Sequence, residues 1–180
     1  MNYNYIMQEK QEKKTQNYYD GIAKGYKNLY HEEQIKKINI IKNQIPKKGK
    51  ILDLGSGDGV LNQFIKNKEE LISFDLSKEL LKLNPNKNEN KIQGSILNMP
   101  FKNEEFDYLI SFTVFQDLSD PKKAILESKR ILKKDGTFIL SFLLLSQNYE
   151  ILINEIKNNF TIISKITEEK DIIFILKNSK

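Results

Sequence analysis

The feature that most constrains this chain is the segment 51–59, which reads ILDLGSGDG. An apolar run that contains one carboxylate, Asp53, is followed by three glycines at alternate positions. A short apolar run predicts a buried strand, and the glycines predict a tight turn where a ligand can approach the backbone closely. Apolar residues at helical spacing start at Val60. We therefore expect a helix there whose N-terminus, with its unpaired N–H groups, suits an anion or a zwitterion.

Apolar runs alternate with helical patterns along the rest of the chain. We expect seven strands, at 51–54, 70–75, 91–94, 106–112, 137–144, 160–166 and 172–176. We expect helices from Val60, at 78–83 behind a capping Ser77, from Pro121 to a stop at Lys134-Asp135-Gly136, and at 148–157. This alternation predicts an α/β fold, with a mostly parallel sheet, helices on both faces and a ligand at the carboxyl ends of the strands. The five residues 167–171 are too few for a parallel crossover, so the last two strands form an antiparallel hairpin.

The N-terminal part of the chain is harder to interpret. Residues 1–14 are polar and are expected to form a frayed tail or the first turn of a helix. The tyrosine-rich segment 15–30 is expected to form short helical pieces, because Gly21 and Gly25 interrupt it.

A clearer helical pattern precedes the first strand. Isoleucines recur at helical spacing between positions 31 and 44 and predict an amphipathic helix that Pro46 ends. We expect the chain to form one domain, with a helical lid at 1–45 and a ligand-binding core at 46–180.

The composition excludes several kinds of site. The chain has no cysteine and one histidine, His31, which rules out disulfides, cysteine nucleophiles and metal sites built on thiolates or histidine clusters. The spacing of the carboxylates predicts no magnesium site either, so we expect no metal. No apolar run approaches the roughly 20 residues of a membrane span, and the first residues lack a signal-peptide core. We therefore expect a cytoplasmic protein that does not contact a membrane.

The net charge of +5 makes nucleic acid a partner to consider. However, the lysines are spread along the whole chain among asparagine, isoleucine and glutamate instead of gathering in one segment. We interpret them as solvated faces in preference to a dedicated nucleic-acid patch.

The glycine turn by itself does not identify a ligand. A dinucleotide fingerprint spaces its glycines as G-x-G-x-x-G, and here Val60 stands in place of the third glycine. Asp75 follows Gly55 by twenty residues and ends the second expected strand. A carboxylate at that place can accept hydrogen bonds from both hydroxyls of a ribose.

Four blocks in order resemble the class I S-adenosylmethionine-dependent methyltransferases, in particular the methyltransferase type 11 or UbiE-like group, from about Tyr18 onward. The blocks are D-x-G-x-G-x-G at 53–59 with the ribose acid Asp75, GSILNMPF at 94–101, FDYLIS at 106–111 and LESKRILKKDGT at 126–137. The last three are similar to the family's G-D-A-x-x-L-P-F, F-D-x-V and L-x-E-x-x-R-V-L-K-P-G-G. The resemblance implies a Rossmann-like three-layer sandwich with a seven-stranded sheet in the order 3-2-1-4-5-7-6. It also implies S-adenosylmethionine as cofactor and S-adenosylhomocysteine as product.

The resemblance further implies which residues meet the cofactor. Asp53 and the glycine turn would hold the methionine moiety, and a tyrosine over the sulfonium would add a cation–π contact of about 1 kcal/mol. Tyr18, Tyr19 and Tyr26 resemble the family's lid, with Tyr19 the first choice, although all three are equally well explained as helix-packing aromatics. The expected cofactor-binding residues are Tyr19, Asp53, Gly55, Ser56, Gly57, Gly59, Asp75, Leu76, Ser95, Ile96 and Ser111.

One residue departs from the family pattern at the adenine. Ser95 stands where the family has an acid that touches the adenine amino group. We expect this serine to weaken cofactor binding modestly or to pass the contact to Asn98.

A catalytic base is difficult to assign. Gln116 and Asp117 follow the fourth expected strand, at the mouth where an acceptor should sit, but such residues also cap turns. His31 beside Glu32 and Glu33 can titrate near neutral pH, but we favour its interpretation as a surface residue at a helix start. The segment after the strand lacks the Asn/Asp-Pro-Pro-Tyr signature, which disfavours methylation of adenine or glutamine amino groups.

Several functions therefore stay open. The first is methyl transfer to a small molecule, and the second is methyl transfer to tRNA or a protein. A cofactor-binding subunit of a larger methyltransferase complex and a nicotinamide-dependent oxidoreductase are further alternatives. The acceptor, the oligomeric state and any activating partner are not encoded in a recognisable motif.

Overall fold

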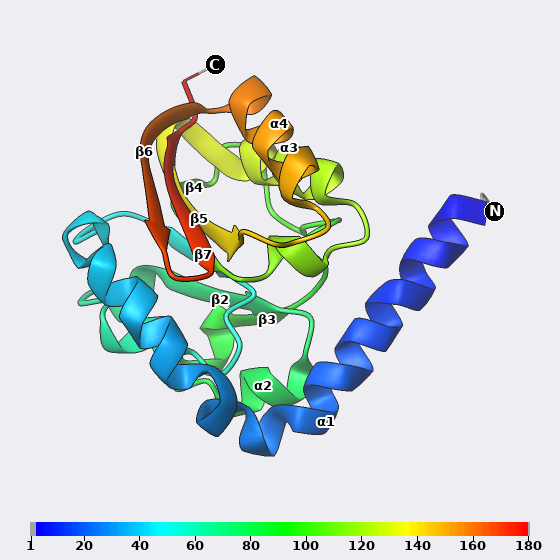
Figure 1. Ribbon diagram of the computed structural model, residues 1–180. Helices are drawn as coiled ribbons and strands as arrows, with labels where there is room; N and C mark the ends of the chain where they lie inside the picture. The colour runs from blue at the N-terminus through cyan, green and yellow to red at the C-terminus, as the bar shows by residue number, and fades with distance from the viewer. Residues whose placement is uncertain (1–2, 180) are drawn as a thin grey trace.

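A single seven-stranded sheet, in the order β3-β2-β1-β4-β5-β7-β6, forms the centre of the computed structural model, which describes residues 3–179 (Figure 1). The strands are β1 (Ile51–Leu54), β2 (Leu71–Asp75), β3 (Lys91–Gln93), β4 (Phe106–Phe112), β5 (Leu132–Leu143), β6 (Thr161–Glu168) and β7 (Asp171–Lys177). The strands β1 to β5 are mutually parallel, and β7 runs antiparallel to both β5 and β6. The expected α/β fold, strand order and C-terminal hairpin are thus confirmed.

Four α-helices surround the sheet in the described part of the chain. They are α1 (Tyr3–Ile40), α2 (Lys78–Leu83), α3 (Pro121–Ile131) and α4 (Tyr149–Asn159), with 3-10 turns η1 (Lys42–Gln44), η2 (Val60–Gln63), η3 (Lys68–Glu70), η4 (Asn88–Asn90) and η5 (Phe115–Asp117). Ser77 caps α2 as expected, because its Oγ accepts a hydrogen bond from the Leu80 N–H at 3.1 Å. None of the described helices is both long enough and apolar enough to cross a membrane.

The two faces of the sheet are covered by different helices. Ala124 of α3 and Leu152 of α4 belong to the core on one face. Ile38 of α1 and Ile41, which directly follows α1, belong to the core on the other face together with Leu61. The opposite faces of one sheet are therefore closed by parts of the chain that lie far apart in sequence.

The helix expected from Val60 is not formed. Only the 3-10 turn η2, four residues long, follows the glycine turn. Leu61 and Ile65 do point into the core, as their spacing predicted, but the C-terminal part of α1 covers the same face of the sheet. Between the left-handed Gly59 and β2 the chain forms η2 and a second 3-10 turn, η3, in place of an α-helix. The expected helix N-terminus for the methionine moiety is therefore absent at this position.

The helical pieces expected before residue 45 are instead one α-helix, α1, of 38 residues. It continues through Gly21 and Gly25 but bends sharply, so that its two halves run in different directions (Figure 1). A glycine inside a helix costs only about 1 kcal/mol, and glycines commonly accompany helix bends. The expectation of a frayed tail or single turn is wrong for residues 3–14, because they belong to α1. Residues 1–2 lie outside the described part of the chain. The helix ends at Ile40, earlier than the expected position 44, and η1 fills the remaining residues.

Candidate functional site

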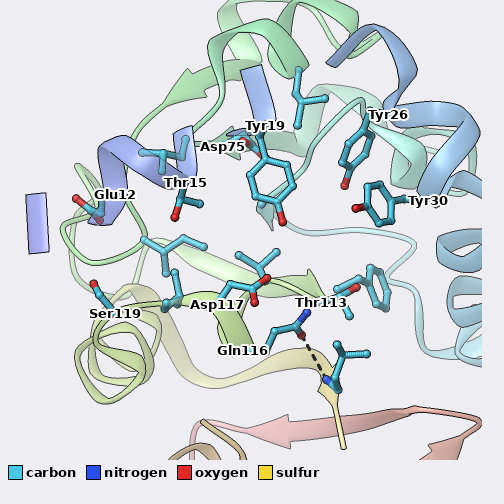
Figure 2. Close-up of a pocket in the computed structure, with 18 of the residues that line it drawn as sticks. Glu12, Thr15, Tyr19, Tyr26, Tyr30, Asp75, Thr113, Gln116, Asp117 and Ser119 are labelled. Atoms are coloured by element: carbon cyan, nitrogen blue, oxygen red, sulfur yellow. Dashed lines mark hydrogen bonds between the residues drawn. The ribbon is translucent and has the colours of Figure 1, made fainter. Parts of the chain in front are cut away.

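A cavity of about 320 Å³ lies at the carboxyl ends of the parallel strands, between α1 and the loops that follow β1 to β4 (Figure 2). Gly55, Leu76, Ile96 and Asp117 line it from those four loops. This is the position where open α/β sheets bind their ligands. From α1 the lining residues are Gln11, Glu12, Thr15, Tyr19, Tyr26, Tyr30, Glu33 and Gln34.

The glycine turn after β1 forms one wall of the site and leaves no room for side chains. Gly55 and Gly59 have φ angles of 74° and 81°, in the left-handed region that favours glycine. A Cβ atom on Gly55 would lie 2.3 Å from Cγ2 of Val114, and one on Gly59 would lie 2.5 Å from Cγ of Asn84. The turn is therefore packed directly against the loop after β4 and the end of α2.

Asp75 ends β2 and fixes the glycine turn from the side. Its Oδ2 accepts a hydrogen bond from the Gly57 N–H at 2.8 Å, and its Oδ1 accepts one from the Ser77 N–H at 2.7 Å. Burial raises the pKa of Asp75 to about 6, although both of these hydrogen bonds oppose the shift. The carboxylate lines the cavity and is ionised above that pH, when it can accept hydrogen bonds from ligand hydroxyls.

A second, smaller cavity of about 20 Å³ lies beneath the glycine turn. Asp53 lines it from β1, Ser56 from the turn, and His31 and Gln34 from α1. Three buried atoms there, Ser56 Oγ, Gln34 Oε1 and His31 Nδ1, have no hydrogen-bond partner in the described part of the chain. All three can accept a hydrogen bond, as can the Asp53 carboxylate, so the void suits a small donor-rich group such as an ammonium.

The Asp53 carboxyl is the most strongly perturbed acid of this region. Burial, with smaller contributions from the charges of Asp75 and Asp58, raises its pKa to about 8. A cation placed in the smaller cavity would stabilise the ionised form and lower that pKa again.

The larger cavity has an apolar end and a polar end. Leu76 and Leu80, which follow β2, and Ile96 and Leu97, which follow the neighbouring strand β3, line the apolar end, and Leu118 also lines the cavity. Glu12 and Ser119 lie at that end in Figure 2, whereas Tyr30 and Thr113 lie at the other, with Asp75 and Tyr19 between them.

Three tyrosines of α1 line the middle and the polar end of the cavity. The rings of Tyr19 and Tyr26 are 6.3 Å apart and those of Tyr26 and Tyr30 are 5.0 Å apart. Burial raises the pKa values of Tyr19 and Tyr26, so both phenols are neutral donors at physiological pH. Tyr18 is 55% exposed and does not line the cavity, so of the two explanations for the expected lid tyrosines, facing the site fits Tyr19 and Tyr26 only.

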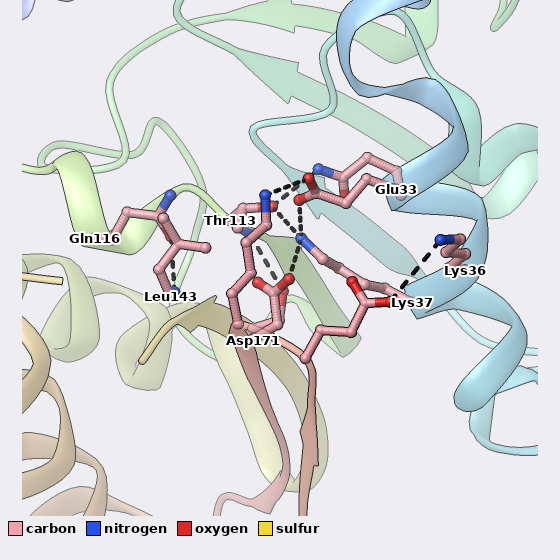
Figure 3. A network of polar contacts seen from close by, with 11 residues as sticks. Glu33, Lys36, Lys37, Thr113, Gln116, Leu143 and Asp171 are labelled. Carbon is pink, nitrogen blue, oxygen red and sulfur yellow. Dashed lines mark hydrogen bonds and ion pairs between the residues drawn. The ribbon is translucent and has the colours of Figure 1, made fainter. Parts of the chain in front are cut away.

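Behind the polar end, a buried cation joins α1 to the loop after β4 and to the hairpin (Figure 3). The Nζ of Lys37 lies 2.8 Å from Glu33 Oε1, 3.0 Å from Asp171 Oδ2 and 3.1 Å from Thr113 Oγ1. Thr113 itself adopts a φ of 57°, which is unusual for a β-branched residue. Gln34 also donates to Thr113 Oγ1, at 2.9 Å, so this strained residue is held from two turns of α1.

The structure distributes the predicted cofactor residues over both cavities. Five of them line the larger cavity: Tyr19, Gly55, Asp75, Leu76 and Ile96. Asp53 and Ser56 line the smaller one together with Gly55, and Gly57 touches the site through its hydrogen bond to Asp75. Gly59, Ser95 and Ser111 line neither cavity; Ser111 Oγ is buried and donates to the Leu54 carbonyl at 2.8 Å.

The three catalytic candidates separate in the same way. Gln116 and Asp117 line the larger cavity, whereas His31 lines the smaller one, 3.9 Å from Asp58. Gln116 Oε1 accepts a hydrogen bond from the Leu143 N–H at 3.3 Å, which is a capping contact to β5. Burial raises the pKa of Asp117, and a hydrogen bond with Gln116 opposes the shift.

Sequence reasoning missed most of the contribution of α1 to the site. Glu12, Thr15, Tyr19, Tyr26 and Tyr30 all line the cavity and follow one another at steps of three, four or seven residues. Such steps place side chains on one face of a helix. The signal was present, but it becomes visible only when the segment is taken as one continuous helix.

Comparison with known proteins finds a known family over part of the chain. A family profile described as a methyltransferase domain matches residues 52–140. An uncharacterized protein of Methanocaldococcus jannaschii is 31% identical over 161 residues, which are 88% of this chain and 63% of that protein. The demethylmenaquinone methyltransferase of Thermotoga maritima is 30% identical over 100 residues, 53% of this chain and 44% of the enzyme. The chain thus spans less than two thirds of the length of these curated relatives.

Solved structures share the fold at low sequence identity. A chain from the complex between the Haloferax volcanii Trm112 methyltransferase activator and a methyltransferase has a TM-score of 0.75 at 13% identity, covering 90% of this chain and 98% of that one. An S-adenosylmethionine-dependent methyltransferase of Thermotoga maritima has a TM-score of 0.71 at 17% identity, covering 91% and 99%.

The residues present suit S-adenosylmethionine part by part. The apolar end can take a base, Asp75 can take ribose hydroxyls, and the unpartnered acceptors of the smaller cavity can take an α-ammonium group. The fold, the profile match and this fit agree. Residues 52–140 belong to the methyltransferase-domain family.

Proposed function

We propose that this protein transfers the methyl group of S-adenosylmethionine to a small-molecule acceptor. The observation that carries the proposal is one cavity that joins Asp75, beside an apolar end, to a separate polar end lined by Thr113, Gln116 and Asp117. The first part suits the cofactor, and the second leaves space for a group that the cofactor does not occupy.

When bound, the cofactor supplies a sulfonium methyl group, which is already a strong electrophile. The protein then has to orient the acceptor and exclude water. Tyr19, Tyr26 and Tyr30 can do both, because their rings cover the middle and the polar end of the cavity. Their π faces also favour a cation by about 0.5–2 kcal/mol.

Asp117 is the proposed proton acceptor, where the acceptor molecule has a proton to lose. It is the one of the three catalytic candidates that faces the cavity without a capping contact to a strand. Its raised pKa makes it a stronger base than an ordinary carboxylate. Gln116 is assigned a positioning role because it binds the Leu143 N–H.

The charges around the cavity favour a small molecule over a nucleic acid. Glu12, Glu33 and Asp117 line it, opposed by one lysine, Lys170, which is paired with Glu33 at 2.7 Å. Carboxylates that line the cavity would repel the phosphates of tRNA. A steep loss of tRNA binding with rising salt would nevertheless support the tRNA alternative.

A second proposal concerns the partner. The Haloferax volcanii neighbour was solved with a methyltransferase activator, which supports an alternative in which this chain is a cofactor-binding subunit that needs an activator. Cofactor binding without turnover over a broad panel of amines, phenols, thiols and carboxylates would favour this alternative.

The direct test is calorimetric titration with S-adenosylhomocysteine and, separately, with NAD. We expect micromolar binding of the former and none of the latter. Asp75→Ala should weaken the binding by about 1.5–3 kcal/mol, because it removes an ionised acceptor of hydrogen bonds. Glu150→Ala, an exposed acid on α4, is the matched control and should change nothing. Tight NAD binding, or an unchanged dissociation constant in Asp75→Ala, would contradict the proposal.

A further inference from the structure

The apolar end of the larger cavity is closed by a carboxylate from an unexpected part of the chain. Glu12, on the N-terminal half of α1, lines the cavity (Figure 2). It also contacts Ser95, which follows β3. The two residues are 83 positions apart in sequence. Asn98, the residue expected to replace the missing acid, is exposed and does not line the cavity.

The direction of the Glu12–Ser95 hydrogen bond is set by a neighbour. Ser95 Oγ accepts a hydrogen bond from the Leu97 N–H at 3.0 Å. Its own proton is therefore free to be donated to Glu12 Oε1. Within the described residues no other donor holds this carboxylate, so Oε2 stays available to a group inside the cavity.

The surroundings of Glu12 define what that group can be. Leu76, Leu80, Ile96 and Leu97 form apolar walls that suit a flat ring. A carboxylate at the edge of such a slot accepts hydrogen bonds and cannot donate them. A ring that carries an amino group on the facing edge therefore gains a charge-assisted hydrogen bond, whereas a ring without a donor leaves the acceptor unpaired.

We propose that Glu12 accepts a hydrogen bond from the exocyclic amine of the cofactor's adenine and sets specificity for a 6-aminopurine, with Ser95 as the residue that positions it. This inference rests on the proposed cofactor. It assigns part of the cofactor site to α1, so the base is recognised only when the N-terminal half of this helix lies against the loop after β3.

The test compares two ligands in calorimetry: S-adenosylhomocysteine and its 6-deamino analogue, in which hydrogen replaces the amino group of the base. The wild-type protein should prefer the amino form about tenfold or more. Glu12→Ala should bring this preference close to one by weakening the amino form alone. Glu12→Gln keeps an acceptor oxygen and should restore an intermediate preference. Glu9→Gln, an exposed acid on the same helix, is the control and should match the wild type.

The outcomes separate this inference from the proposed function. If the wild type binds both ligands and Glu12→Ala leaves the preference unchanged, or weakens both ligands equally, the role of Glu12 is refuted while the cofactor assignment stands. If the wild type binds neither ligand, the proposed function fails and this inference fails with it. Ser95→Ala should lower the preference less than Glu12→Ala does, because it removes only the positioning contact.

Discussion

The two halves of α1 are held in very different ways. Near its C-terminal end, Ile38 and Ile41 are almost completely buried in the core, and Lys37 is 2% exposed among carboxylates. The N-terminal half is joined to the loops around the site by polar contacts. Glu12 contacts Ser95, and Asp20 accepts hydrogen bonds at the start of α2. One half is part of the core, and the other is attached to its surface.

This difference bears on how a ligand enters. Contacts made of a few part-buried hydrogen bonds open at a much lower free energy than a buried core does. The N-terminal half carries Glu12, Thr15 and Tyr19, which line the cavity. We therefore expect this half to move when the ligand binds or leaves, while the C-terminal half keeps its place on the sheet.

The largest expected effect comes from breaking the anchored half. Lys37→Ala leaves Asp171, itself 3% exposed, as a buried charge without its cation. We expect the free energy of unfolding to fall by about 3–5 kcal/mol, as measured by urea denaturation. Lys36→Ala is the control, because Lys36 pairs with Glu169 at 4.0 Å with both side chains 70% exposed. Equal effects of the two substitutions would show that the buried cation does not anchor α1.

The second prediction concerns the pH dependence of stability, through Asp53, which lines the smaller cavity together with His31 and Gln34 of α1. The pKa of Asp53 is about 8 in the folded protein and about 3.9 in an unfolded chain. Between these values the folded state binds more protons than the unfolded state, so the free energy of unfolding should fall as the pH rises from about 4 to about 8. Asp75, with a pKa of about 6, contributes with the same sign over a narrower range.

Asp53→Asn should remove most of this slope. We expect it to stabilise the ligand-free protein more at pH 8 than at pH 5, by a difference on the order of 2–4 kcal/mol in denaturation experiments. Glu150→Gln, on the surface of α4, provides the comparison. A slope that persists in Asp53→Asn would place the titrating group elsewhere.

A smaller effect is expected from releasing the N-terminal half. Asp20 Oδ1 accepts hydrogen bonds from Ser77 Oγ at 2.5 Å and from the Glu79 N–H at 3.1 Å. Asp20→Ala should lower the free energy of unfolding by only about 1–2 kcal/mol. Hydrogen exchange should speed up in residues 3–20 and not around Ile38. Asn17→Ala, at an exposed position of the same half, is the control. Loss of protection along the whole helix would mean that the two halves form one unit.

The smallest effect has the opposite sign. A Cβ atom on Gly21 would meet no heavy atom within 4 Å, and the same holds for Gly25. Gly21→Ala should therefore raise the stability of the N-terminal half by about 0.5–1 kcal/mol through helix propensity, with slower hydrogen exchange there. Destabilisation instead would show that the bend requires the conformational freedom of glycine.

Much of the site near the sheet could be predicted because its signals are local. The run 51–54, the three glycines and Asp75 lie within 25 residues, and their spacing alone predicts a strand, a turn and a second strand end. Gly55 and Asp75 both line the larger cavity. The helix expected from Val60 is the exception: the segment forms only 3-10 turns, and Ile38 of α1, distant in sequence, shares a core with Leu61.

The sequence by itself thus determined the sheet, its order through the family resemblance, and the residues at the strand ends. Period-two and period-3.6 patterns and glycine spacing are written in adjacent residues and need no partner to be recognised. Only the tertiary structure decided that residues 3–40 form one bent helix, that Lys37 is buried beside Asp171, and that Glu12 reaches Ser95. These contacts depend on which surfaces meet after the chain has folded, and the free energy of burying a charge or pairing a carboxylate exists only once they have met.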